Sequence, residues 1–243
     1  MMIGVPRNFV RAHLKRVPQP VNVATMIDRL SSPQFALKVL VATTVVATAW
    51  SVSSPHDFAI WCFELLPGIA GVIGVTLLSR RFRFSALLYY VIACSFVMIA
   101  VGARYTYAEV PLMNWVRDAL GLSRNYFDRV GHFVQGLTVG LLAREVLLRT
   151  TQFCCRFAAA FLTACVALAF SAFYELLEWW CVVPFYPDAG PEWLGMQGDP
   201  WDAQWDMSLA LAGAVTGMLL LGRQHDRGIA AVVGSDGEPG GDA

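Results

Sequence analysis

The sequence carries little charge. Only 15% of its 243 residues are Asp, Glu, Lys or Arg, whereas soluble domains usually contain about 25%. Hydrophobic residues make up 56% of the chain, and the mean hydropathy is +0.52. The formal net charge is zero, so no basic excess indicates a nucleic-acid partner. These shortages exclude an ordinary soluble domain and favour a protein that lies in a membrane.

Several motifs of known chemistry are also missing. None of the six cysteines shows Cys-x-x-Cys spacing, so a thiolate zinc or redox centre is not indicated. There is no Gly-rich phosphate loop, and Ser123 and Ser171 lack the elbow motif of a nucleophilic serine. A disulfide could join Cys62 to Cys181 near the outer surface, but nothing in their spacing requires one, and free thiols are favoured.

Long apolar runs fill the middle of the chain. A basic segment, residues 1–34, precedes them without the pattern of a cleaved signal peptide. A Gly-rich, acidic tail, residues 223–243, predicts disorder. Since about 20 apolar residues cross a bilayer as a helix, the sequence predicts an all-α polytopic protein whose six transmembrane helices lie within 35–222. The predicted spans are roughly 35–52, 58–78, 84–103, 130–148, 157–182 and 205–222.

The distribution of charge predicts the orientation of these spans. Fourteen of the 18 Lys and Arg residues fall in the N-terminal segment, in the loops after the second and fourth spans, and in the tail. By the positive-inside rule, both termini are expected in the cytoplasm of a bacterial cell, with the spans in its inner membrane. Twelve of the 18 acids map to the opposite, outer half, together with many aromatic residues that fit an interfacial belt.

Ionisable groups recur at the outer ends of three predicted spans. Asp128 and His132 share one face of the fourth span, because they are four residues apart. Glu175 and Glu178 likewise share a face of the fifth, and Asp206 begins the sixth. Ionisable groups in membranes usually face a bundle interior or a wet cavity. We therefore expect one outward-facing cavity, with these five residues as the candidate catalytic set.

Other residues at the same depth are candidates for binding a substrate. Among them, Arg104 is expected to help offset the carboxylates. Glu64, about two turns inside the second span, is a further acid that needs an explanation. The candidate binding residues are Arg104, Tyr107, Glu109, Gln135, Asp199, Trp201 and Asp202.

The candidate set contains more acid than base. A cluster that only fixed helix packing would be expected to balance its charge, although packing is an equal alternative for any single residue. Surplus carboxylates invite a cation, which could be a metal ion, a proton or a cationic substrate group. His132, Glu175 and Asp206 could hold a divalent metal through mixed nitrogen and oxygen ligands, but no second His lies nearby. Carboxylates together with a substrate phosphate are an equally open way to bind a metal.

Other ionisable residues fit ordinary structural roles. Arg144 and Glu145, near the inner end of the fourth span, fit a snorkelling ion pair. His13, His56 and His225 fit solvent-exposed surface positions.

Five segments occur in a characteristic order: "RYTYAEVP", "FDRVGHFVQG", "REVLLR", "FYELLEWW" and "GDPWDAQWDM". Together they resemble the YjdF-type family of conserved inner-membrane proteins, whose function is unknown, over roughly residues 35–223. The chain is more distantly similar to the VanZ-like family, which is linked to teicoplanin resistance. That family has an Asp-Lys-x-x-His motif, where this chain has Arg for Lys, and an Asn where this chain has Ala210. The matching positions are Asp128, His132, Glu175, Asp206, Gly213 and Gly217.

Three classes of function remain open. The first is an enzyme or binding protein that acts on an amphipathic lipid or cell-envelope precursor at the outer leaflet. The second is a small transporter that uses the carboxylates and His132 as a proton or cation relay. Transport predicts polar groups along the full depth of the membrane, and the inner halves of the last three spans contain few. The third is a non-catalytic scaffold, which would tolerate the loss of single carboxylates.

Overall fold

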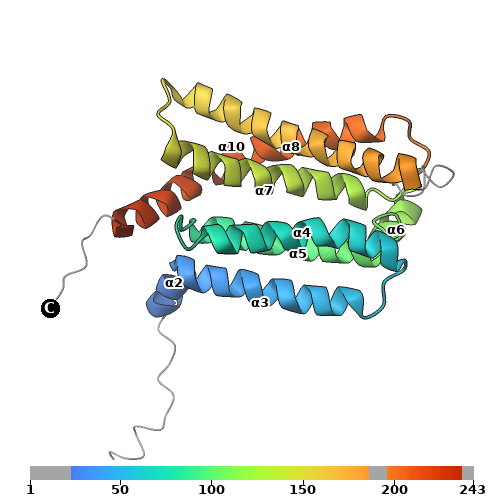
Figure 1. The fold of residues 1–243 in the computed structure, drawn as a ribbon, viewed down its shortest axis with the longest axis horizontal. Coiled ribbons are helices and arrows are strands. Elements are labelled where there is room, and N and C mark those ends of the chain that lie inside the picture. The colour runs from blue at the N-terminus through green and yellow to red at the C-terminus, as the bar shows by residue number, and fades with distance from the viewer. Residues whose placement is uncertain (1–22, 186–195, 237–243) are drawn as a thin grey trace, which may run out of the picture.

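Long helices dominate the computed structural model, which describes residues 23–185 and 196–236. In this part of the chain every regular element is a helix, and the long helices run alongside one another (Figure 1). The all-α prediction is confirmed. The helices are α2 (Val23–Ser31), α3 (Pro33–Val52), α4 (Phe58–Leu78), α5 (Ala86–Arg104), α6 (Pro111–Leu120), α7 (Phe127–Thr150), α8 (Arg156–Phe185) and α10 (Asp202–Asp236).

Five of the described helices, α3, α4, α5, α8 and α10, are long and apolar enough to cross a membrane. They correspond to five of the six predicted spans, and their bounds, apart from the end of α10, lie close to the predicted ones. Each apolar run supplies a helix of 19 residues or more, and a helix of about 20 residues matches the hydrocarbon thickness of a bilayer. The protein is therefore a polytopic membrane protein, as predicted.

Helix α7 takes the place of the remaining predicted span, residues 130–148. Its 24 residues would extend about 36 Å at the usual helical rise, which exceeds the roughly 30 Å of hydrocarbon. Its composition is less apolar than that of the other five, because it contains groups such as Asp128, His132 and Glu145. A span at α7 thus stays a prediction, and it requires neighbouring helices to cover these polar groups.

Helix α10 covers α7 at very short range. A Cβ atom placed on Gly136 of α7 would lie 1.8 Å from the carbonyl oxygen of Ala210. A Cβ atom on Gly213 of α10 would lie 1.9 Å from the carbonyl oxygen of Phe133. Only glycine allows the two backbones to approach so closely, as in small-residue contacts between membrane helices. This contact fixes α7 and α10 side by side and sets the register of the polar groups on both.

Helices α3, α4 and α5 form the other half of the bundle. Their buried core includes Leu40, Leu65 and Phe96. The Ser51 hydroxyl links all three helices, since it accepts a hydrogen bond from Trp61 Nε1 (2.9 Å) and donates one to the carbonyl oxygen of Ala100 (2.7 Å). All six cysteines are free, in agreement with the favoured interpretation, so no disulfide supports this packing.

The tail differs from its prediction. Helix α10 does not stop near residue 222 but continues to Asp236, so the expected disorder is wrong for residues 223–236. Residues 237–243 lie outside the described residues. The extra turns matter because they bring His225 and Asp226 against the end of α7.

These extra turns complete a buried polar group that we name the Glu145 cluster: Ser85, Glu145, Arg149 and His225. Glu145 is 0% exposed and accepts hydrogen bonds from the Ser85 amide (2.9 Å), the Ser85 hydroxyl (2.8 Å) and Arg149 Nη1 (3.2 Å). His225, also 0% exposed, lies with Nε2 2.9 Å from Glu145 Oε2. Two interpretations from the sequence are therefore wrong: Glu145 is not half of a snorkelling pair, and His225 is not on the surface.

Arg144 shows how the hydrogens of the Glu145 cluster are arranged. Its guanidinium forms an ion pair with Asp226 (2.6 Å) rather than with Glu145, and Nη1 lies 3.3 Å from His225 Nδ1. Because arginine can only donate, His225 Nδ1 accepts a hydrogen bond from Arg144. His225 Nε2 therefore carries the ring proton and donates a hydrogen bond to Glu145. Every polar atom at the centre of this cluster is thereby matched.

Candidate functional site

The opposite end of the α7–α10 contact holds a second group of polar side chains, which we name the His132 cluster: Asp128, His132, Glu175 and Asp206. His132 Nε2 lies 3.6 Å from Asp128 Oδ1 and 3.6 Å from Glu175 Oε1. One ligand atom each of Asp128, His132 and Asp206 lie within 4.8 Å of one another. Three helices, α7, α8 and α10, thus bring together side chains that are far apart in the sequence.

The His132 cluster is buried, and several of its polar atoms have no hydrogen-bond partner among the described residues. His132 is 7% exposed and Asp206 is 2% exposed. His132 Nδ1, Glu175 Oε1 and Asp206 Oδ1 have no hydrogen-bond partner in the part of the chain that the structure describes, and neither has Gln135 Oε1 beside this region of α7. Each buried polar atom left in this state costs about 1–3 kcal/mol. A cluster that existed only to pack helices would not be expected to retain several of them.

Two arginines offset part of the acid around the cluster. Arg124 forms a buried ion pair with Asp202 and donates to the carbonyl oxygen of Met196 (3.1 Å). Arg129 pairs with Asp199 and lies 3.7 Å from Asp202. Asp199 and Asp202, which were expected to bind substrate, are therefore engaged by arginines of the same chain.

Asp199 is held in its charged form. Its carboxylate accepts a hydrogen bond from the Trp201 amide (2.9 Å), which lowers the pKa of Asp199, and the contact with Arg129 lowers it further. The loop before α10 is thus tied to α7 by an ion pair whose acid stays ionised.

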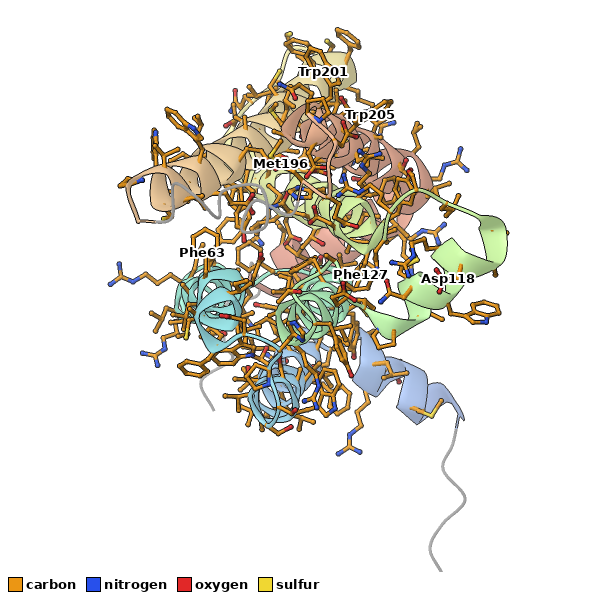
Figure 2. The ribbon with its side chains drawn as sticks, turned by 90° about the vertical axis from the view of Figure 1, so that its right-hand side faces the viewer. Phe63, Asp118, Phe127, Met196, Trp201 and Trp205 are labelled. Carbon is orange, nitrogen blue, oxygen red and sulfur yellow. The ribbon has the colours of Figure 1, made fainter. Side chains whose placement is uncertain are left out.

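Three of the expected binding residues lie elsewhere. The Arg104 guanidinium faces α3, where it donates to the Ser53 hydroxyl (3.0 Å) and stacks on Trp50 with 4.6 Å to the ring centroid. Glu109 is exposed and accepts from Asn114 at 3.1 Å. Trp201 is 64% exposed at the α8–α10 edge of the bundle, in the end-on view of Figure 2. The expectation that Arg104 offsets the carboxylates is wrong, because Arg124 and Arg129 do so.

Tyr107 does face the acids. Its backbone and that of Thr106 adopt positive φ angles, 54° and 52°, which turn the chain sharply after α5. The Tyr107 ring then lies over Gly102, where an added Cβ would be 2.3 Å from a ring carbon, and beside Gly131, at 3.3 Å. Two glycines on different helices thus make room for this one aromatic ring.

The hydroxyl of Tyr107 lies near further carboxyls. Burial raises the pKa of Tyr107 well above its usual range, and the negative charges of Glu64, Asp128 and Glu178 raise it further. Glu64 of α4 also lies near the Tyr174 hydroxyl. The acidic region therefore extends from the His132 cluster to Glu178 of α8 and to α4.

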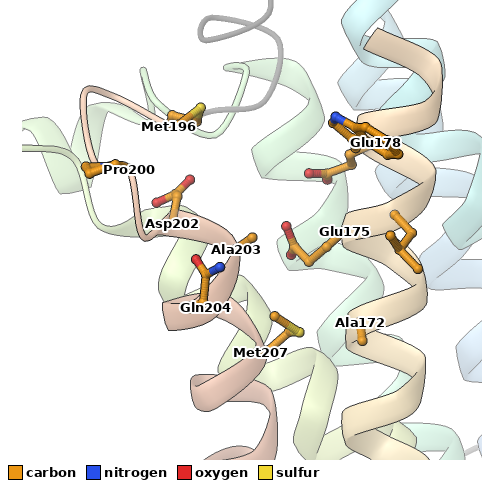
Figure 3. Close-up of a pocket in the computed structure, with 11 residues that line it drawn as sticks. Ala172, Glu175, Glu178, Met196, Pro200, Asp202, Ala203, Gln204 and Met207 are labelled. Atoms are coloured by element: carbon orange, nitrogen blue, oxygen red, sulfur yellow. The ribbon is translucent and has the colours of Figure 1, made fainter. Parts of the chain in front are cut away.

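A cavity of about 430 Å³ opens between α8 and α10 next to the cluster. Figure 3 shows Glu175 of α8 and Asp202 of α10 on its opposite walls, with Met207 and Ala172 further along it. One part of the lining is polar and the other is apolar. The polar lining is Glu175, Glu178, Asp202 and Gln204, and the apolar lining includes Ala172, Leu176, Trp179, Met196 and Met207.

Sequence reasoning missed several members of this region. Arg129 lies within the motif that contains Asp128 and His132, but its pairing with Asp199 was not predicted, and the motif position was the available signal. Tyr174 precedes Glu175, yet a single tyrosine in an apolar helix carries no distinct signal. The pairing of Arg124 could not be found, because it depends on how the loops before α7 and α10 meet.

The chain matches known proteins over most of its length. The model of the family described as "Predicted membrane protein (DUF2238)" matches residues 36–227. The chain is 45% identical over 174 residues to "Inner membrane protein YjdF" of Escherichia coli (strain K12), which covers 72% of this chain and 83% of that protein. No solved structure matches. The matched region runs from the first turn of α3 into α10 and includes both polar clusters, and the chain belongs to the DUF2238 family of predicted membrane proteins.

Proposed function

We propose that this inner-membrane protein binds an amphipathic lipid or cell-envelope precursor in the α8–α10 cavity and acts on its polar headgroup through the His132 cluster. The observation that supports this most is the position of unpaired, buried polar atoms beside a cavity lined by both polar and apolar side chains. An amphipathic molecule matches this mixed lining, since ligand sites combine apolar contact with a few placed polar groups.

The chemistry within reach is acid–base catalysis. His132 and the carboxylates of Asp128, Glu175 and Asp206 are the side-chain types that transfer protons to and from a reacting group. Glu178 and Gln204 would contact the headgroup from the cavity wall. Trp179 and Met207 would contact the apolar part of the same molecule.

The location of the cavity rests on the predicted topology. With six spans and both termini in the cytoplasm, the His132 cluster opens toward the outer leaflet. Labelling tests this directly in a Cys-free background: Glu192→Cys should react with a membrane-impermeant maleimide added outside the cell, and Arg81→Cys should not. The reverse pattern would place the cavity on the cytoplasmic side and exclude an outer-leaflet substrate.

Two alternatives fit the geometry less well. A transporter needs a polar path through the membrane, whereas the α7–α10 contact between the two clusters is closed by Gly136, Gly213 and Ala210 backbones. A scaffold needs no unpaired buried groups, whereas His132 and Asp206 carry them. The distant similarity to the VanZ-like family stays a prediction.

The proposal is tested by identifying what copurifies with the protein. The protein is purified from its native membrane in a mild detergent, and bound lipids and envelope precursors are extracted and quantified by mass spectrometry. We expect one amphipathic class to be enriched on the wild-type protein and reduced at least tenfold on Glu175→Gln. The control is Glu109→Gln, an equivalent change at an exposed position on the same side. Equal profiles for all three proteins would overturn the proposal.

A further inference from the structure

The four members of the His132 cluster have the donor atoms of a metal site. One imidazole nitrogen and three carboxylates converge from three helices, and the nitrogen lies 3.6 Å from two of the carboxylate oxygens. With metal–ligand distances of about 2.1 Å, neighbouring ligands of a tetrahedral ion are ~3.4 Å apart, and opposite ligands of an octahedral ion ~4.2 Å apart. The separation of 3.6 Å is too long for a direct hydrogen bond but close to the spacing between two ligands of one ion.

The charges of the cluster also call for a cation. Among the described residues, no ion pair joins a Lys or Arg to Glu175 or Asp206. Arg129, which lies nearby, is bound to Asp199 and stacked against Tyr126 (5.2 Å) and Trp205 (5.5 Å). Its guanidinium is thus held toward the loop and offsets only part of the negative charge of the cluster.

The orphaned atoms supply an independent observation. Asp206 and His132 are more than nine-tenths buried, and both retain a polar atom without a hydrogen-bond partner. The Asp206 carboxylate lies within 4.8 Å of ligand atoms of His132 and Asp128, and its Oδ1 has no hydrogen-bond partner. An ion at the centre, bound by His132 Nε2, would use the lone pairs of Glu175 Oε1 and Asp206 Oδ1 that the protein leaves unmatched.

We propose that Asp128, His132, Glu175 and Asp206 form a binding site for one divalent transition-metal ion. The site rests on the proposed function in that it uses the same cluster and would place the ion beside the α8–α10 cavity, against a phosphate or other anionic headgroup. The imidazole ligand favours Mn²⁺, Fe²⁺ or Zn²⁺ over Ca²⁺ and Mg²⁺, which prefer oxygen ligands alone.

Metal content and thermal stability test the site. Wild-type protein in detergent is stripped with a chelator, dialysed, and titrated with Mn²⁺ or Zn²⁺. We expect about one equivalent of metal per chain and a rise in the melting temperature on adding it. Asp206→Asn and His132→Gln should each weaken binding at least about tenfold, as expected when a ligand is lost.

Matched controls separate the site from adventitious surface binding. Asp118→Asn and His56→Gln make the same changes at exposed residues, and Asp118 lies on α6 at a different edge of the bundle from Trp201 and Trp205 (Figure 2). Both should bind metal like the wild type. Pulsed electron paramagnetic resonance with Mn²⁺ should show coupling to one imidazole nitrogen in the wild type and none in His132→Gln. Stoichiometric binding without this coupling, or no difference between site and control variants, would refute the site.

The outcome for the metal is independent of the outcome for the lipid. Lipid extraction from the chelated wild-type protein shows whether binding persists without metal. Retained lipid with no measurable metal binding would remove the site and leave the proposed function standing. Metal binding with no enriched lipid would keep the site and remove the proposed function. A melting temperature that responds to pH but not to metal would mean that protons alone balance the cluster, which also overturns the site.

Discussion

The Glu145 cluster and the His132 cluster are built from the same kinds of residue, at the two ends of one helix pair. Each places a buried histidine of α7 or α10 next to a carboxylate from another helix. In the Glu145 cluster the nitrogen–oxygen distance is 2.9 Å, and all the atoms around it are paired. In the His132 cluster the corresponding distances are 3.6 Å, and several buried atoms have no partner.

We infer from this difference that the Glu145 cluster has a structural role and the His132 cluster a functional one. Burial and charge alone do not distinguish the two clusters, since both contain buried ionisable groups in an apolar bundle. What distinguishes them is whether the protein itself completes the hydrogen bonding. A completed cluster contributes to stability, and we propose that the incomplete one binds a ligand. The comparison can be tested by breaking each cluster in the same way.

The largest loss of stability is expected in the Glu145 cluster. Glu145→Gln places an amide donor among the donors of Ser85, His225 and Arg149, so it leaves buried groups unpaired. The free energy of unfolding should fall by about 3 kcal/mol. Denaturant or thermal unfolding in detergent measures it, with the exposed Glu109→Gln as control. A loss below about 1 kcal/mol would mean that the cluster is not a structural clamp.

A smaller loss is expected where the two clusters are connected. Gly136→Ala puts a Cβ against the Ala210 carbonyl and must push α7 away from α10. The cost should be about 1–3 kcal/mol, and the metal affinity should fall with it, because the His132 cluster spans the same contact. The matched control is Gly74→Ala, where nothing lies within 4 Å of the new Cβ. Equal stability of the two variants would contradict the backbone contact.

The His132 cluster should respond in the opposite direction. In the presence of a chelator, Glu175→Gln or Asp206→Asn removes one of several neighbouring negative charges. Stability should therefore stay the same or rise by up to about 1 kcal/mol, while metal and lipid binding are lost, a trade-off that is typical of functional sites. Unfolding is measured beside the binding assays on the same preparations. If the free energy of unfolding of both variants falls by more than about 2 kcal/mol, the His132 cluster is structural, like the Glu145 cluster.

The smallest effect on metal and lipid binding is expected for a substitution of Arg104. Because its guanidinium faces Ser53 and Trp50 rather than the acids, Arg104→Gln should leave metal and lipid binding unchanged. Stability should fall by roughly 0.5–1 kcal/mol through the lost cation–π contact. A metal titration of this variant tests this prediction, and a tenfold weaker affinity would show that Arg104 contributes to metal binding.

The sequence predicts the bundle and part of the candidate site because both follow from local patterns. Apolar runs of about 20 residues mark the spans, and the i, i+4 spacing of Asp128 and His132 places them on one face. Since Glu175 and Asp206 lie at the same depth as this face, their meeting with His132 could be anticipated.

The parts that escaped prediction depend on contacts between distant segments. Arg129 reaches Asp199 only because the loop before α10 folds over the start of α7. Glu145 is buried only because α10 continues past residue 222 and brings His225 to it. A charged, Gly-containing end such as "GRQHDRG" gives little local indication that a helix continues, since the partners that support it are supplied by α7.

The length of α10 has a consequence for the membrane around the protein. Its 35 residues extend about 52 Å, well beyond the roughly 30 Å of bilayer hydrocarbon. Asp206 and His225 are about 28 Å apart along this axis at the helical rise, so the two clusters are spaced like the two boundaries of the hydrocarbon. The separation of the two clusters along the helix pair is therefore close to the thickness of the hydrocarbon. In a bilayer of markedly longer or shorter acyl chains, hydrophobic mismatch would draw one cluster into lipid or expose it to headgroups, and reconstitution should favour chains that match this spacing.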